Sequence, residues 1–110
     1  MTQYLVEATY TPGAVGTMVS HPQNRREALR PVIERLGGRL DAFFHVASEP
    51  AAVAIVDLPD TAAAAAFVMA VTSSGAVRSL TLRALLTPEE AMLSMAAAAH
   101  MQYQPPIAKT

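Results

Sequence analysis

The stretch RLDAFFHVASEPAAVAIVDL, residues 39–58, decides the fold. Its first part, residues 39–46, places apolar residues at every second position, which is typical of a β-strand with one buried face. Ser48-Glu49-Pro50 ends this pattern, and residues 51–58 then carry almost no polar side chain on either face. A strand that is apolar on both faces lies in the centre of a sheet. We therefore expect two strands here, the second of them central.

Signals for helices flank these two strands on both sides. Before them, residues 25–36 have apolar residues at helical spacing, and Gly37-Gly38 supplies a left-handed stop. Ser20-His21-Pro22-Gln23 matches a capping box and predicts the start of this helix. After the strands, Asp60 is the expected N-cap of a helix that ends near Gly75.

Two further strands and two helices complete the chain. QYLVEATYT, residues 3–11, is rich in β-branched and aromatic residues, and Thr11-Pro12 then predicts a short helix to about residue 19. Residues 76–86 give the fourth strand. Thr87-Pro88-Glu89-Glu90 combines an N-cap, a first-turn proline and a capping-box glutamate, and it begins a last helix that runs to about residue 101.

The resulting order is βαββαβ with an additional C-terminal helix. This order predicts an α+β, ferredoxin-like domain, in which two helices pack on one face of a four-stranded antiparallel sheet. The chain has 110 residues and is 52% hydrophobic, and a chain of this size buries about 65% of its surface on folding. We expect one domain over residues 1–101 and a tail over residues 102–110.

The helices can cover only one face of this sheet, and strand alternation assigns residues to the two faces. The more apolar set is expected under the helices: Tyr4, Val6, Ala8, Tyr10, Leu40, Ala42, Phe44, Val46, Leu80, Leu82 and Ala84. The opposite face is expected to be mixed and to include Leu5, Glu7, Thr9, Asp41, Phe43, His45, Val77, Ser79, Thr81 and Arg83. The third strand adds apolar residues to this opposite face. The face of four strands has an area of roughly 400 Å², which is comparable to the largest apolar patch on a soluble monomer.

An uncovered face of this kind predicts self-association. A second copy that packs face to face would cover it and would leave a partly polar cavity between the two sheets. The predicted partner is therefore the chain itself, as a homodimer or a higher homo-oligomer. An open sheet with its second face in water is the alternative, because antiparallel sheets often leave one face solvated.

The composition argues against several classes of protein. Eight Lys and Arg against nine Asp and Glu give a net charge of −1, which disfavours a nucleic-acid partner. No cysteine is present, so disulfides, thiolate metal sites and a cysteine nucleophile are excluded. The longest apolar run, residues 62–71, is too short to span a membrane, and no secretory signal is readable. We therefore expect a cytoplasmic protein without a membrane partner.

Several segments of the chain resemble the GYD-domain family of small bacterial proteins. They are YLVEATYTPGAVGTM at residues 4–18, NRREALRPVIERLGGRLDAFF at 24–44, VAIVDLPDTAAAAAF at 53–67, SGAVRSLTLRALLTPEEAM at 74–92 and YQPP at 103–106. The resemblance implies a fold and an assembly of the dimeric α/β-barrel type, and it implies no particular activity. Before the third strand this chain reads Ala47-Ser48-Glu49-Pro50-Ala51-Ala52 in place of the family's Gly-Tyr-Asp type turn, so no role of those family residues is carried over.

Polar residues of the mixed face are the candidates for a site. Glu7 would act as a general base if burial in an inter-sheet cavity raised its pKa; a glutamate that faces water or pairs with Arg83 is the other interpretation. His45, on the same expected face as Asp41, is a candidate for proton transfer or an ordinary edge-strand histidine. The candidate ligand-binding residues are Glu7, Asp41, Phe43, His45 and Arg83.

Two functions fit these features. The three histidines, His21, His45 and His100, match no metal-ligand spacing, and no phosphate-binding or dinucleotide-binding glycine motif is present, so no metal or organic cofactor is predicted. The first function is a non-enzymatic oligomeric module that binds a small molecule or serves in assembly. The second, by analogy of fold, is a monooxygenase- or isomerase-like enzyme without an organic cofactor, with Glu7 and His45 as its acid–base pair.

Overall fold

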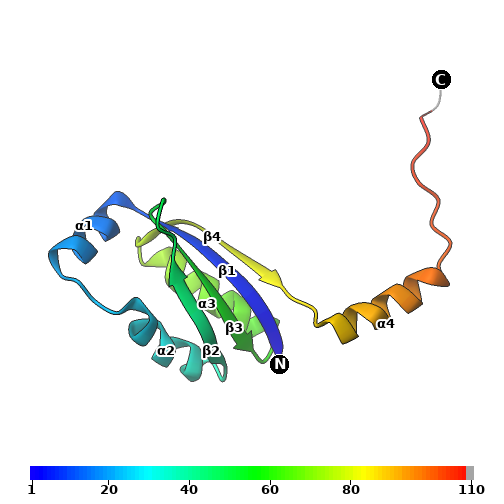
Figure 1. Cartoon of the computed structure of the whole chain (residues 1–110), viewed down its shortest axis with the longest axis horizontal. Coiled ribbons are helices and arrows are strands. Elements are labelled where there is room, and N and C mark those ends of the chain that lie inside the picture. Colours follow the sequence, from blue (N-terminus) through cyan, green and yellow to red (C-terminus); the bar gives the residue numbers. More distant parts are fainter. Residues whose placement is uncertain (109–110) are drawn as a thin grey trace.

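The computed structural model describes residues 1–108 and consists of one sheet, helices on one of its faces, and a C-terminal arm (Figure 1). The four strands are antiparallel neighbours in the order β2-β3-β1-β4. Their bounds are β1 Thr2–Tyr10, β2 Arg39–His45, β3 Ala51–Leu58 and β4 Val77–Ala84. The sheet therefore has β1 and β3 at its centre and β2 and β4 at its edges, and the predicted α+β, ferredoxin-like order is confirmed.

Two of the four helices build the core against the sheet. The helices are α1 Pro12–Ser20, α2 Arg25–Arg35, α3 Thr61–Ser73 and α4 Pro88–Ala99. Helix α2 packs over β2, and α3 packs over β3 and β4. Ile33 of α2 and Phe67 of α3 share one buried cluster with Val6 of β1 and Val56 of β3, so both helices cover the same face. No helix within residues 1–108 has the length and hydrophobicity to cross a membrane.

Local capping fixes where three of these helices begin, as the sequence predicts. Thr11 accepts a hydrogen bond from the Ala14 amide at 3.2 Å, and Asp60 accepts one from the Ala63 amide at 2.8 Å. Thr87 forms the complete capping box at the start of α4. These side chains satisfy amide groups that have no partner inside their helix.

The predicted cap of α2 at residues 20–23 is wrong. Ser20 is still the last residue of α1, and Asn24 is the N-cap, with its side chain accepting from the Glu27 amide at 3.2 Å. Helix α2 therefore begins at Arg25, and the Arg25 side chain lies beside residues of the sheet.

A glycine pair makes the turn from α2 into β2. The Gly38 amide donates to the Ile33 carbonyl at 3.0 Å and the Gly37 amide to the Glu34 carbonyl at 2.9 Å, which is a Schellman motif. Gly37 has a φ of 83°, a value that favours glycine. At Gly38 a Cβ atom would lie 2.1 Å from the Asp57 carbonyl oxygen, so only glycine lets β2 begin this close to β3.

A β-bulge in β2 changes which side chains face the helices. Leu40 lies opposite Val56 and Ala42 lies opposite Ile55, which leaves Asp41 as the extra residue. From Ala42 onward the alternation is therefore reversed. Phe43 packs against the core, whereas Phe44 is 66% exposed on the other face.

The expected assignment of β2 to faces is wrong after the bulge. Ala42 and Phe44 lie on the open face, and Phe43 and His45 lie on the helix-covered face, since they pair with Ala54 and Ala52 of the core. A second register shift, between Thr9 and Tyr10, turns Val77 toward the helices as well. The remaining residues of β1 and β4 lie on the expected faces.

The last helix does not join the core. Leu85 extends the pairing of β4 with a 2.8 Å hydrogen bond from its amide to the Gln3 carbonyl, and α4 then projects away from the sheet (Figure 1). No residue of α4 is buried, and Met92, Leu93 and Met95 are all at least 67% exposed. The radius of gyration is 18.1 Å, against about 13 Å for a compact chain of this length, because of this arm.

Candidate ligand-binding cleft

A cleft separates α2 from α3 above the centre of the sheet. Because α2 packs over β2 and α3 over β3 and β4, part of the covered face between them carries no helix. The volume left open is about 240 Å³. Its floor is formed by small residues of the two central strands, Ala8, Ala52 and Ala54, which leave the space that larger side chains would fill.

The walls of the cleft are apolar. Leu29 and Val32 line it from α2, and Phe67 and Val71 line it from α3. Phe43 closes it on the side of β2, a position that the bulge makes possible. Such a surface favours an apolar molecule, because burying apolar surface of both the ligand and the cleft away from water contributes to binding.

Polar groups gather at one end of the cleft. Arg25, at the first position of α2, and Tyr10, at the end of β1, both line it there. Burial raises the pKa of the Tyr10 hydroxyl, and the charge of the nearby Arg25 opposes this rise with a smaller effect. His45 lies beside this end, with its ring centre 6.2 Å from that of Tyr10 and 5.3 Å from that of Phe43.

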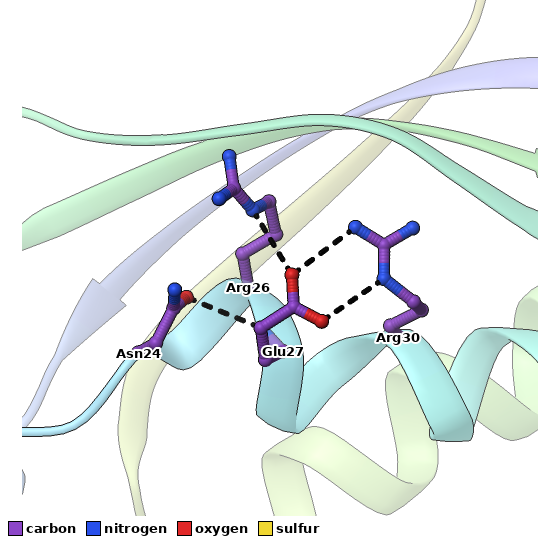
Figure 2. Close-up of polar contacts among 4 residues, drawn as sticks. All are labelled: Asn24, Arg26, Glu27 and Arg30. Atoms are coloured by element: carbon purple, nitrogen blue, oxygen red, sulfur yellow. Dashed lines mark hydrogen bonds and ion pairs between the residues drawn. The ribbon is translucent and has the colours of Figure 1, made fainter.

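Arg25 differs from its neighbours on α2 in having no acidic partner. Figure 2 shows that Arg26 and Arg30 both bind the Glu27 carboxylate, at 3.4 Å and 3.3 Å, beside the Asn24 cap. The hydrogen bond from Arg30 is the main cause that lowers the pKa of Glu27. Arg25 instead donates from Nη1 to Gln23 Oε1 at 2.7 Å, and no carboxylate among residues 1–108 forms an ion pair with it.

On the opposite, open face, Glu7 is half-exposed and forms an ion pair with Arg83 of the neighbouring strand β4. This is the pairing that the sequence left as one of two interpretations of Glu7. In the single chain 41% of its side chain is exposed, and the burial expected for Glu7 belongs to a cavity between two copies. In the single chain, Glu7 therefore acts as a cross-strand partner of an arginine.

A second polar cluster joins three strands at the other end of the open face. Arg39 of β2 binds Asp41 at 2.6 Å and Asp57 of β3 at 2.8 Å, and Gln3 of β1 donates to Asp41 at 3.0 Å. The hydrogen bond from Arg39 is the main cause that lowers the pKa of Asp41. Every member of the cluster has a partner, so its arrangement fits a role in holding the bulge.

Comparison with known families agrees with this architecture. The family model of the GYD domain matches residues 4–96. The chain belongs to the GYD domain family. The matched part of this GYD domain contains the whole sheet and the cleft, and it ends inside α4. No curated protein and no solved structure matches the chain.

The residues predicted to share one site in this GYD domain lie on two faces of the sheet. Glu7, Asp41 and Arg83 lie on the open face, whereas Phe43 and His45 lie on the side of the helices. The expectation that all five lie on one face is wrong for Phe43 and His45, and the bulge at Asp41 is the reason. No group of three or more potential metal ligands occurs in residues 1–108.

Sequence reasoning assigned to a site none of the polar residues that line the cleft, which are Arg25, Tyr10 and Ser74. The sequence pattern assigns no role in a site to Arg25, and it predicts Tyr10 only as a strand residue covered by the helices. The signal that would have separated Arg25 is its position directly after the Asn24 cap, with no glutamate adjacent to it or three or four residues away; Arg26 is adjacent to Glu27, and Arg30 follows it by three residues.

Proposed function

We propose that this GYD domain is an oligomeric module that binds a small, mainly apolar molecule in the cleft between α2 and α3. The observation that carries the proposal is a mainly apolar cleft of about 240 Å³ in which Arg25, Tyr10 and Ser74 are the few polar lining residues. Concave, largely apolar pockets with a few convergent polar groups are the usual form of small-molecule sites. Since a cavity of about 150 Å³ binds benzene, this cleft has room for roughly ten non-hydrogen atoms.

The open face supports self-association as part of this proposal. Leu5, Val53 and Ile55 lie side by side across the two central strands and are only partly buried, and the exposed Phe44 lies opposite Val53. A second copy that packs on this face would remove these side chains from water. The ion pair of Glu7 with Arg83 would lie within such an interface, because Glu7 is opposite Val53 on the central strands, and the pairs of Arg39 with its aspartates would lie toward one end of it.

An enzyme of the monooxygenase or isomerase type, without an organic cofactor, is the second candidate. The observation in its favour is the pair of titratable rings, Tyr10 and His45, at the polar end of the cleft. Glu7 lies on the other face, so it does not reach a molecule that contacts His45 within the same chain. In this version of the proposal, proton transfer falls to His45 and Tyr10.

The binding proposal is tested with a neutral probe and a blocked cleft. Octanamide, which has ten non-hydrogen atoms, is titrated into the labelled protein and followed by amide NMR shifts. Ala70 is an exposed residue of α3 that lines the cleft, so Ala70→Phe is expected to weaken binding at least tenfold. The matched control is Ala65→Phe, an exposed alanine of the same helix that does not line the cleft. Equal binding by the wild type and both variants would contradict the proposal.

Self-association is tested separately by analytical ultracentrifugation of the full chain over a range of concentrations. The proposal expects a dimer or a higher oligomer that dissociates on dilution. A monomer at all concentrations would remove the oligomeric part of the proposal and leave the cleft unaffected.

A further inference from the structure

We infer that the cleft selects a ligand with one carboxylate group on a small apolar body, and that Arg25 binds this carboxylate. This inference rests on the proposed function, because it specifies the class of ligand for the same cleft. The starting point is the charge of the lining: among residues 1–108, Arg25 is the only charged side chain that lines the cleft. A neutral ligand would leave this charge unanswered, and an anionic ligand compensates it.

The pairing of the other arginines near the sheet makes Arg25 distinct. Arg26 and Arg30 share Glu27 (Figure 2), Arg39 binds two aspartates and Arg83 binds Glu7. Arg35 and Arg78 also form no ion pair within residues 1–108, but neither lines the cleft. Arg25 is half-buried against the cleft, where its guanidinium donates to the neutral side chain of Gln23 and interacts with the Tyr10 hydroxyl. A half-buried guanidinium without an acid nearby has an unused preference for a carboxylate.

The surroundings of Arg25 add donors and no competing acid. The bond to Gln23 holds one end of the guanidinium and leaves the other N–H groups for a ligand. Tyr10 also lines the cleft, and its hydroxyl, whose ordinary pKa of 10.0 is raised by burial, is protonated at neutral pH and donates to an anionic group. The positive end of α2 begins at the same residue, which favours a negative group further.

The apolar part of the ligand follows from the rest of the lining. Leu29, Val32 and Val71 offer no hydrogen-bonding side chain, so the body of the ligand lies among hydrocarbon groups while its carboxylate stays at the polar end. A medium-chain or compact aromatic carboxylic acid of roughly ten non-hydrogen atoms has this form. Arg25 then positions the ligand, and the apolar walls supply most of the affinity.

The test compares two probes of the same size that differ only in charge, octanoate and octanamide. We expect octanoate to bind the wild type about tenfold more tightly than octanamide, as for a charge-assisted contact that is partly open to water. Arg25→Gln is expected to abolish this preference, so that octanoate and octanamide bind the variant with equal affinity. Arg26→Gln, which removes the neighbouring arginine that is already paired with Glu27, is expected to keep it.

The outcomes distinguish a failure of the carboxylate inference from a failure of the proposed function. Equal binding of both probes by the wild type would overturn the carboxylate inference and leave the proposed function standing. Binding of neither probe would overturn the proposed function and this inference with it. If Arg25→Gln does not fold, Arg25→Lys and Arg25→Met with the same two probes replace it. A preference for octanoate that is kept in Arg25→Lys and lost in Arg25→Met supports the inference. A preference that is the same in Arg25→Gln and Arg26→Gln would overturn it.

Discussion

Adjacent phenylalanines of β2 offer the sharpest test of the structure. Simple alternation from Leu40 places Phe44 under the helices and Phe43 on the open face. The bulge at Asp41 reverses this assignment, so that Phe43 packs on the core and lines the cleft while Phe44 is 66% exposed. Replacing each phenylalanine by alanine in turn therefore distinguishes the two arrangements.

The two substitutions are expected to differ by more than 1 kcal/mol. Removing a fully buried phenylalanine costs about 3–5 kcal/mol. Phe43 is partly buried and borders a cleft that is already open, so Phe43→Ala is expected to lower the free energy of unfolding by about 2 kcal/mol. Phe44→Ala removes a side chain that is mostly in water, and about 0.5 kcal/mol is expected.

Urea denaturation followed by far-UV circular dichroism measures both values, since the chain has no tryptophan. The denaturation slope should be the same in the three proteins, because only stability is expected to change. The measurement is made at a protein concentration where the chain is monomeric, so that an effect of Phe44 on self-association does not enter. A larger loss for Phe44→Ala than for Phe43→Ala would refute the bulge and restore the simple alternation.

Four further results are expected. Gly38→Ala should lower the free energy of unfolding, measured by urea denaturation, by about 3 kcal/mol or more, because its Cβ would lie 2.1 Å from the Asp57 carbonyl oxygen. Gly75→Ala, at a φ of 78° with open space around it, should lower it by only about 1–2 kcal/mol. Equal losses would contradict the close approach at Gly38. Arg39 lowers the pKa of Asp41, so the ionised Asp41 carboxylate stabilises the fold at pH 6, and this contribution is lost as the pH falls below the ordinary aspartate pKa of 3.8. In thermal unfolding, the stability difference between the wild type and Arg39→Gln should therefore shrink below about pH 4. A difference that stays constant with pH would speak against the contact. Arg25→Gln should shift the titration of Tyr10 to higher pH, because the arginine lowers the pKa of that hydroxyl; an unchanged phenolate absorbance curve would place the two groups apart. Truncation after Leu86 should change the melting temperature by less than about 3 °C, since no residue of α4 is buried, and a large decrease would show that the arm packs on the core.

Local signals explain why most of the architecture could be predicted from the sequence. Caps such as Thr87 with Glu90 act within one helical turn, and the stop at Gly37 requires only a residue that tolerates a positive φ. The apolar run of β3 is visible without knowledge of its partners. Each of these features depends on residues close together in the chain, and each was confirmed.

The bulge could not be predicted because its stabilising contacts come from distant parts of the chain. Asp41 is held by Gln3, 38 residues away, and by Arg39, whose second partner is Asp57. Nothing in the local pattern of β2 reveals these contacts. One extra residue then reversed the faces of Phe43 and His45, and the predicted site was divided between two faces for this reason alone.

The cleft could not be predicted from the sequence pattern either, because its size depends on the distance between two helices. Its floor is made by Ala8, Ala52 and Ala54, in central strands where larger β-branched residues are common. At roughly 24 cal/mol per Å³, leaving 240 Å³ unfilled would cost about 6 kcal/mol if the space were dry and closed, and less where water enters. A ligand that fills this space returns part of that free energy when it binds. The same alanines therefore weaken the free protein and create the room for a ligand, so a substitution that improves packing at these positions must reduce binding.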